Sequence, residues 1–377
     1  MEFLVRLEGG ERMTDLCREY GISRKTGHGL LNRYRARGVI ALEEQSRAPK
    51  HIPHRTTPEL VELILAARKK HPSWGPKKLK VVLEGELGHD LPAASTIGSV
   101  LRKHGFVSQG RQRPRYLARP SSRLTAAEAA NDVWCADYKG QFRLGDGSYC
   151  YPLTVTDQYS RFLLACDGMA AIREEHARDV FEHVFRKRGL PLMMRTDNGV
   201  PFATTGVGGL SKLTVYWMLL GISHERTRPA HPEENGRHER MHRTLKLETT
   251  RPAGANLLQQ QERFDAFIET FNEKRPHEAL NMERPASVYQ ASLRPHPVHV
   301  PEPRYPGHDD TLYVTKSGWV RLPRRGSVYV SSALAGQPVG IREDNDGRWL
   351  VSFMEMHLGH VTKERKFEPL ETARGQS

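Results

Sequence analysis

An ordered change of pattern between residues 130 and 227 most constrains the fold of this chain. Three β-rich runs come first, separated by turns: DVWCADYKGQF, YCYPLTVTDQYS and RFLLACDGM. Helical and strand patterns then alternate: EEHARDVFEHVFRKRG, LPLMMRTD, LSKLTVYWMLLG and ISHERT. Three antiparallel strands followed by alternating helices and strands predict a multidomain α/β chain with a mixed five-stranded sheet. Residues 232–250 and 257–273 read as further helices.

The N-terminal 120 residues carry most of the net charge. They hold 23 Lys and Arg against 12 Asp and Glu, which is +11 of the chain's formal +13. A basic N-terminal region joined to a near-neutral remainder of the chain favours a polyanionic partner, and nucleic acid is the first candidate. Many basic proteins bind no polyanion, so charge alone leaves the partner open.

Residues 1–45 have the pattern of a helix-turn-helix unit. Met13, Leu16 and Cys17 repeat at helical spacing, Gly21 breaks the helix, and Ser23 can cap a second one. The other face of that helix suits phosphates and base edges, with Arg24, Lys25, His28, Asn32, Arg33 and Arg35. The alternative is a plain helical hairpin with a solvated basic face.

Residues 55–107 predict a second helix-turn-helix unit. Its last helix would begin at Ser95 or Thr96 and end at Arg102 and Lys103, like a second recognition helix. Residues 108–127 form a basic, Arg- and Pro-rich linker. This segment is either a solvated connection or an arm in a DNA groove, and the sequence leaves the two even.

The C-terminal third divides at a second linker. Residues 291–308 are Pro-rich, which predicts a stiff, extended segment rather than a packed element. Residues 309–371 alternate like short strands and predict a small β-barrel of the SH3-like kind.

Composition excludes several classes of protein. The sequence has no run of eighteen apolar residues and no signal-like N-terminus, so we expect a cytoplasmic protein without a membrane partner. The four cysteines form no CxxC pair, which argues against a zinc ribbon or a disulfide framework and favours reduced, buried thiols. They are Cys17, Cys135, Cys150 and Cys166.

Three carboxylates of the central region stand out by context. Asp137 lies inside the first strand, Asp197 ends the fourth, and Glu239 lies on the following helix. A lone charge on a buried strand is costly without a partner. Carboxylates from two strands and a packed helix can meet at a sheet edge and hold two Mg²⁺ ions about 3.5–4 Å apart.

A family resemblance supports this choice. In order, VWCADYKG, RTDNGVPF, HPEENGRHERMHRTLK and FNEKRPHEALNMERPASVY resemble the catalytic core of bacterial insertion-sequence transposases of the retroviral-integrase superfamily. The resemblance implies an RNase H-like core over residues 128–290 and a DDE triad. In that family the glutamate follows an NG or QG step by three positions, which selects Glu239 after Asn235-Gly236.

Other carboxylates have plainer explanations. Glu233 and Glu234 precede the NG step, where negative charge complements the start of a helix. Asp157 sits at a hairpin turn and is expected to hydrogen-bond the loop. Two features depart from the family: the interval from Asp197 to Glu239 is long, and family members often begin upstream of this Met1.

The stretch HERMH at residues 238–242 also spells the HExxH of zinc peptidases. Arg237, Arg240 and Arg243 crowd it and would repel Zn²⁺, so we do not interpret it as a peptidase site. Glu239, Arg243 and Lys246 share one side of the helix, as expected of a DNA-contacting face. We expect His238 and His242 to flank that surface or to lie in solvent.

The resemblance implies metal-dependent cleavage of element ends and transfer of the 3′-OH to target DNA, with two Mg²⁺ or Mn²⁺ ions. It also implies a homo-oligomer, while Asn198, His238 and Arg240 are candidate accessory residues. The C-terminal barrel would contact DNA or another subunit. His51 and His54 lack a cysteine pair, so we expect no zinc module. Two alternatives stay open: a DNA-binding regulator with an inactive core, and a nuclease without strand transfer.

Overall fold

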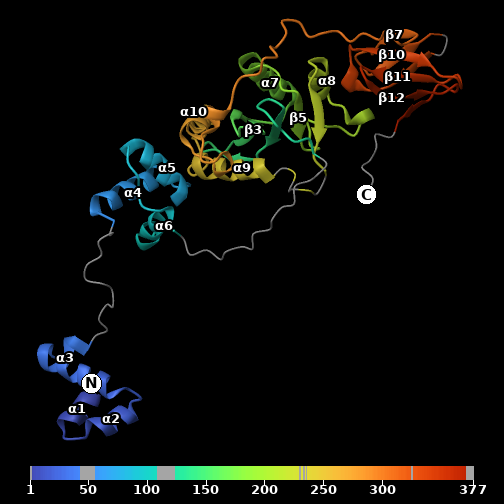
Figure 1. The fold of residues 1–377 in the computed structure, drawn as a ribbon. Coiled ribbons are helices and arrows are strands. Elements are labelled where there is room, and N and C mark those ends of the chain that lie inside the picture. The colour runs from blue at the N-terminus through green and yellow to red at the C-terminus, as the bar shows by residue number, and fades with distance from the viewer. Residues whose placement is uncertain are drawn as a thin grey trace. The chain divides into compact units, whose positions relative to one another are not determined.

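The computed structural model describes residues 2–42, 56–107, 124–228, 231, 234, 236–323 and 326–370 (Figure 1). The chain divides into two compact units, Met1–Pro58 and Glu59–Ser377. Most of the basic linker expected at residues 108–127 lies outside the described residues, as do His51, His54, Glu233 and Asn235.

The first unit is a three-helix domain. Its helices are α1 Glu2–Glu8, α2 Met13–Glu19 and α3 Arg24–Arg37, followed by the 3₁₀ turn η1 Val39–Leu42. The predicted N-cap is confirmed, because the Ser23 Oγ accepts a hydrogen bond from the Thr26 N–H at 3.1 Å. A Cβ at Gly27 would lie 2.7 Å from the Met13 and Cys17 sulfurs, so a larger residue would have to displace these side chains between α2 and α3. Helix α1 was not predicted.

Three further helices follow in the second unit. They are α4 Pro58–Lys70, α5 Pro76–Leu87 and α6 Ala94–Lys103. Their apolar faces share one core, made of Ile64, Trp74, Leu79, Leu83, Leu91, Ile97 and Leu101. Helix α6 begins at Ala94 with Ala93 as its N-cap, so the predicted start at Ser95 or Thr96 is wrong by one or two residues.

The central domain is built on a mixed sheet. Its strands are β1 Val133–Tyr138, β2 Phe142–Arg143, β3 Tyr149–Asp157, β4 Leu163–Met169, β5 Met193–Thr196 and β6 Ser223–Arg226. β3 pairs antiparallel with β1 and with β4, whereas β5 runs parallel to both β1 and β6. The sheet has six strands rather than the predicted five, because the two-residue β2 pairs with the start of β3.

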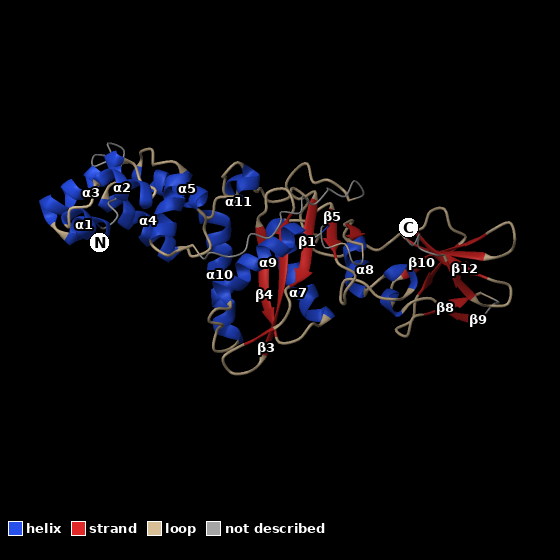
Figure 2. Ribbon diagram, turned by 90° about the horizontal axis from the view of Figure 1, so that it is seen from below, coloured by secondary structure: helices blue, strands red, loops and turns tan. Residues whose placement is uncertain are grey.

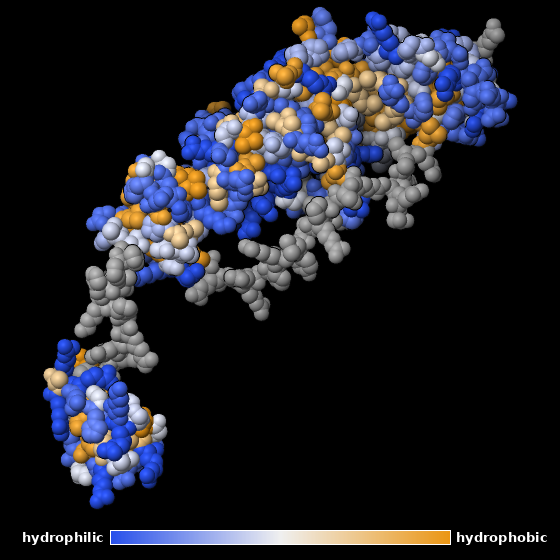
Figure 3. Space-filling model, in the orientation of Figure 1, coloured by the Kyte–Doolittle hydropathy of each residue, from blue (hydrophilic) through white to orange (hydrophobic). Residues whose placement is uncertain are grey.

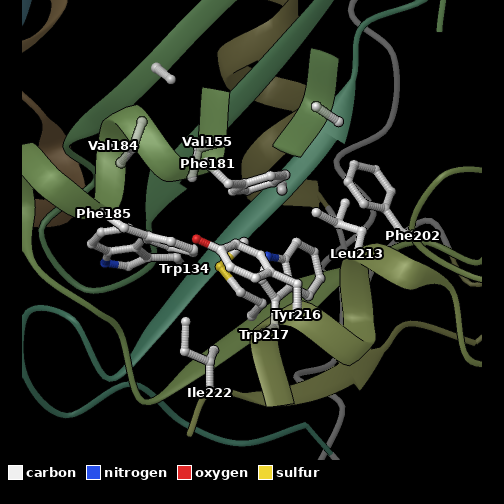
Figure 4. Packing of buried hydrophobic residues seen from close by; sticks show 14 of the residues in the cluster. Trp134, Val155, Phe181, Val184, Phe185, Phe202, Leu213, Tyr216, Trp217 and Ile222 are labelled. Atoms are coloured by element: carbon white, nitrogen blue, oxygen red, sulfur yellow. The ribbon is translucent and has the colours of Figure 1, made fainter. Parts of the chain in front are cut away.

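Helices cover both faces of this sheet (Figure 1). One face packs against α7 Glu174–Arg188 and α8 Lys212–Leu219 around the aromatic cluster shown in Figure 4. The other face packs against α9 Gly236–Thr249 and α10 Leu257–Glu269. Short helical turns complete the domain: η2 Val207–Gly209, η4 Thr270–Lys274, η5 Glu278–Leu280 and α11 Pro285–Val288.

The C-terminal region forms two antiparallel sheets (Figure 2). Their strands are β7 Asp310–Tyr313, β8 Trp319–Leu322, β9 Gly326–Tyr329, β10 Pro338–Glu343, β11 Trp349–Phe353, β12 Met356–Val361 and β13 Phe367–Pro369, with the 3₁₀ turn η6 Ser332–Leu334 between β9 and β10. Five strands form the order β13-β12-β11-β10-β7, and β8 and β9 form a hairpin. Whether this region is an SH3-like barrel stays a prediction.

The Pro-rich segment 291–308 contains no helix or strand, yet it is more than a free linker. The Arg294 guanidinium donates to the backbone oxygens of Leu220 and Gly221 at 3.2 and 2.8 Å. At the other end Tyr305 is buried, and its hydroxyl donates to the Pro338 oxygen at 2.7 Å. Both ends of the segment are therefore packed, contrary to the prediction.

The four cysteines are buried and free, as expected. Burial raises the pKa of Cys135 and of Cys150 to about 11, so neither is a reactive thiolate near neutral pH. Within the described ranges, no helix is long and apolar enough to cross a membrane. Hydrophilic residues dominate the face shown in Figure 3, with hydrophobic ones in small patches.

Candidate active site

Asp137 lies near the C-terminal end of β1, the strand between β3 and β5. Asp137 lies opposite Thr154 of β3, and opposed residues of antiparallel strands project from the same face. The Thr154 side chain contacts α9, so this is the face that α9 covers. Neighbouring Trp134 and Ala136 belong to the core on the opposite face. The Asp137 side chain is 17% exposed, which leaves its carboxylate reachable from one side.

Asp197 directly follows β5. The parallel register pairs Cys135 with Arg195, so two residues further on, Asp137 and Asp197 reach the same edge of the sheet. The Asp197 Oδ1 accepts a hydrogen bond from the Gly199 N–H at 3.0 Å. Asn198 donates its side-chain amide to the Thr227 oxygen at 2.6 Å. Asn198 thus ties the loop after β5 to the end of β6, an anchoring contact that the sequence did not predict.

The histidines of α9 are buried, with His238 3% and His242 6% exposed. The expectation that they flank a DNA surface or lie in solvent is therefore wrong. The Nε2 atoms of both rings lie 2.6 and 2.7 Å from the Thr154 Oγ1. That hydroxyl also donates to the backbone oxygen of Asp137 at 3.0 Å. Since a hydroxyl has one proton, we infer that both imidazoles donate to Thr154.

Glu239 lies on the exposed side of α9. Arg240, Arg243 and Lys246 are exposed as well, whereas Met241 and Leu245 are buried between α9 and the sheet. The predicted DNA-facing side of this helix therefore consists of solvent-exposed cations around one carboxylate.

The structure does not gather the three predicted carboxylates into one tight cluster. Among the described residues, the group of metal-competent side chains with ligand atoms within 4.8 Å of one another is Asp137, His238 and His242. His242 Nδ1 lies 3.8 Å from Asp137 Oδ2, which is beyond hydrogen-bond distance. Asp197 and Glu239 are outside this group.

Two carboxylates at this edge offer oxygen ligands that suit a hard divalent cation. Asp137 and Asp197 are partly exposed carboxylates at one sheet edge, and Mg²⁺ prefers oxygen ligands. The two imidazoles instead bond the Thr154 hydroxyl from inside the domain. The HExxH histidines are thus joined to a strand, which gives no support to a peptidase site.

The neighbouring carboxylates have structural roles. Asp157 is 1% exposed and accepts hydrogen bonds from the backbone N–H groups of Asn131 and Ser160 at 2.8 and 2.7 Å, which confirms its expected loop role. Burial raises the pKa of Asp157. Glu234 forms an ion pair with Arg228 at 2.7 Å, so a specific partner, in addition to the start of α9, accounts for its charge.

The predicted DNA-contacting side chains of the helical domains are accessible. On α3 the exposed ones are Arg24, Lys25, His28 and Arg35, and Arg33 is half-buried. On α6, Arg102 and Lys103 are exposed. Their contact with DNA stays a prediction.

Sequence reasoning missed an ion pair beside Asp197. Arg195 is 4% exposed, and its guanidinium contacts the Glu225 carboxylate of β6 and the Thr125 oxygen, each at 2.6 Å. Breaking such a buried pair is costly, so it holds β5 and β6 together just before Asp197. The arginine in MMRTD was a usable signal, because a charge inside a buried strand needs a partner.

Buried histidines predict a pH-dependent stability. Burial lowers the pKa of His238 and of His277 to about 3 and that of His242 to about 2, against about 6.5 in an unfolded chain. Below pH 6.5 the unfolded chain binds protons that the folded chain does not, so stability falls as pH drops towards 3. Each such histidine contributes about 1.4 kcal/mol per pH unit in this window.

We therefore expect the urea midpoint of unfolding to fall between pH 7.5 and pH 5.5. The variant His277→Asn should lower the slope of stability against pH by about half a proton on average over this range, and by nearly one proton below pH 5.5. The exposed His89 supplies the matched control, His89→Asn, with an unchanged slope. An identical slope in all three proteins would contradict the assignment.

Comparison with known proteins agrees with this architecture. Residues 127–232 and 220–285 match two families described as integrase core domain, and residues 26–101 match a homeodomain-like domain. The chain is 26% identical over 181 residues to the Gag-Pol polyprotein of baboon endogenous virus (strain M7), covering 47% of this chain and 10% of that protein. The chain thus spans about a tenth of that relative's length.

Solved structures with lower similarity include the HTLV-2 integrase catalytic core domain in complex with magnesium, at 14% identity and a TM-score of 0.35. That match covers 44% of this chain and 100% of the other. Another is the simian T-cell lymphotropic virus intasome in complex with the PP2A regulatory subunit B56 gamma, at 14% identity and a TM-score of 0.39, covering 80% and 99%. Residues 127–285 are therefore similar to integrase core domains, and helical domains precede them.

Proposed function

We propose that this chain is a DNA transposase of the DDE class, of the insertion-sequence kind. The observation that carries the proposal is the placement of Asp137 and Asp197 at one edge of an integrase core sheet, on adjacent parallel strands. Glu239, exposed on the helix that covers the Asp137 face, would complete the triad. The helical domains would bind the terminal repeats of the element, and the protein would act as a homo-oligomer on two ends.

Each residue of the proposed site would have a role that follows from its position. Asp137 and Asp197, with Glu239, would hold two Mg²⁺ or Mn²⁺ ions, which supply charge neutralisation and water activation at a phosphodiester when bound. The hydrogen bonds between Thr154 and the two histidines hold β3 against α9. They therefore position Glu239 of α9 relative to Asp137 of β1. Arg243 and Lys246, one and two turns after Glu239, would contact the DNA backbone. Arg240 would be an accessory residue beside them.

A strand-transfer assay tests the function. Purified protein is incubated with a labelled duplex carrying the element's own terminal repeat and with a plasmid target, in Mg²⁺ or in EDTA. We expect nicked ends and joined products only with the metal. Nicking without joining would indicate a nuclease. Tight, specific binding without any cleavage in Mg²⁺ or Mn²⁺ would favour a helix-turn-helix regulator.

Two glutamates of the same segment separate the triad from its surroundings. We expect Glu239→Gln to lower cleavage and joining by roughly 10²–10³-fold with an unchanged melting temperature, because its side chain is exposed. Glu234→Gln, which weakens the ion pair to Arg228, should retain most of the chemistry. The reverse pattern in the same assay would assign the third position to Glu234.

A further inference from the structure

The hairpin β8–β9 presents an aromatic outer face. Its register places Trp319 opposite Tyr329 and Arg321 opposite Ser327, and all four side chains are exposed. The alternating residues Val320, Leu322 and Val328 are at most 3% exposed and belong to the core of the domain. One side of the hairpin thus supports the domain, and the other faces solvent with its largest side chains.

The two outer aromatic rings form a defined pair. Trp319 is 44% and Tyr329 47% exposed, and their centroids lie 5.8 Å apart at an interplanar angle of 71°. A Cβ at Gly318 would lie 2.7 Å from Tyr329 Cε2, and Gly318 has a φ of +86°. The tyrosine ring therefore rests on a position that only glycine fills easily. Burying the faces of two such rings is favourable in free energy, and exposure to water leaves that free energy unused. A ligand that covers the rings would therefore bind more tightly.

The charge around this face favours an anionic ligand. The described residues 311–323 and 326–341 contain Lys316 and Arg321 and no Asp or Glu. Lys316 and Arg321 are exposed, and neither has an ion-pair partner in the part of the chain that the structure describes. Tyr313, 58% exposed on β7, donates its hydroxyl to the Glu302 carboxylate at 2.6 Å. Exposed rings beside unpaired cations are the combination that binds bases and phosphates together.

We propose that this hairpin face, defined by Trp319, Arg321 and Tyr329, binds unpaired nucleotides of DNA. Base faces are hidden inside a duplex, whereas in a single strand they are free to stack on the rings. Arg321 would contact the adjacent phosphate. The inference rests on the proposed function only in taking DNA as the ligand, and it extends that function to single-stranded flanks next to the sites of cleavage.

Binding without catalysis tests this proposal. The full-length protein is titrated in EDTA with three fluorescein-labelled probes: oligo-dT, a duplex of unrelated sequence, and that duplex with a single-stranded 3′ overhang. We expect Trp319→Ala/Tyr329→Ala to bind oligo-dT and the overhang about tenfold or more weakly, with duplex binding unchanged. Arg321→Gln should reduce the salt dependence of oligo-dT binding by about one phosphate contact. Tyr149→Ala, an aromatic 39% exposed on another domain, is the matched control.

A spectroscopic measurement separates stacking from a loss of folding. Trp74, Trp134 and Trp217 are at most 1% exposed and Trp349 is half-buried, so Trp319 is the tryptophan whose fluorescence oligo-dT should quench most. Trp319→Phe should remove most of the quenching and retain the affinity. Equal oligo-dT affinity in the wild type and the double variant would overturn the proposal. If that variant instead changed only the sedimentation behaviour of the protein, the face would be a protein interface. Because no metal is present, these outcomes are independent of whether the chain cuts DNA.

Discussion

Replacing Asp197 with asparagine is expected to lower metal-dependent end cleavage and joining by roughly 10²–10³-fold or more. An asparagine Oδ1 can still accept the hydrogen bond from the Gly199 N–H, so the loop after β5 should keep its conformation. What the variant loses is the negative charge at the sheet edge that a divalent cation would neutralise. The defect should therefore appear in the chemistry and not in the fold.

Three measurements on Asp197→Asn make this prediction sharp. End cleavage in Mg²⁺ should be lost, binding of the terminal-repeat duplex in EDTA should be unchanged, and Mg²⁺ binding by calorimetry should weaken. Asp179→Asn is a matched control, because Asp179 is an exposed carboxylate on α7, which packs on the opposite face of the sheet. Full cleavage by Asp197→Asn would remove Asp197 from the triad, whereas loss of duplex binding would mean that the variant perturbs more than the metal site.

The sheet was predictable because its strands have simple sequence patterns. Apolar runs bounded by turns predicted β1, β3, β4 and β5. Three successive strands followed by alternating helices and strands predicted a sheet with both antiparallel and parallel pairs. Strand β2 was missed because two residues, Phe142 and Arg143, have no periodicity to detect. It exists only because the start of β3 offers a partner edge.

The candidate site was predictable where it depends on strand ends and unpredictable where it depends on packing. Asp137 and Asp197 followed from their positions on strands that lie side by side. The burial of His238 and His242 did not follow, because HERMHR has charges on every side and resembles a solvated helix face. The decisive residue is Thr154, a fully buried threonine on β3, and one threonine among the alternating residues of YPLTVTD carries no special signal.

Replacing Thr154 with valine should destabilise the protein by about 2–4 kcal/mol at pH 7.5. Valine has nearly the same shape but no hydroxyl, so two buried imidazole N–H groups lose their acceptor, and each unsatisfied buried donor costs about 1–3 kcal/mol. The Asp137 carbonyl also loses a donor. Chemical unfolding gives the change in stability, and we expect cleavage activity to fall as well, because α9 carries Glu239.

A neighbouring threonine provides the internal comparison for Thr154→Val. Thr156 contacts only one of the rings, His238 Nδ1 at 3.2 Å, so Thr156→Val should cost clearly less. Removing a donor together with its acceptor should restore part of the loss, which makes Thr154→Val/His238→Leu less destabilised than the sum of its two single changes. If the two changes were simply additive, the hydroxyl and the imidazole would not be coupled. The link from α9 through β3 to Asp137 would then have to be apolar packing alone.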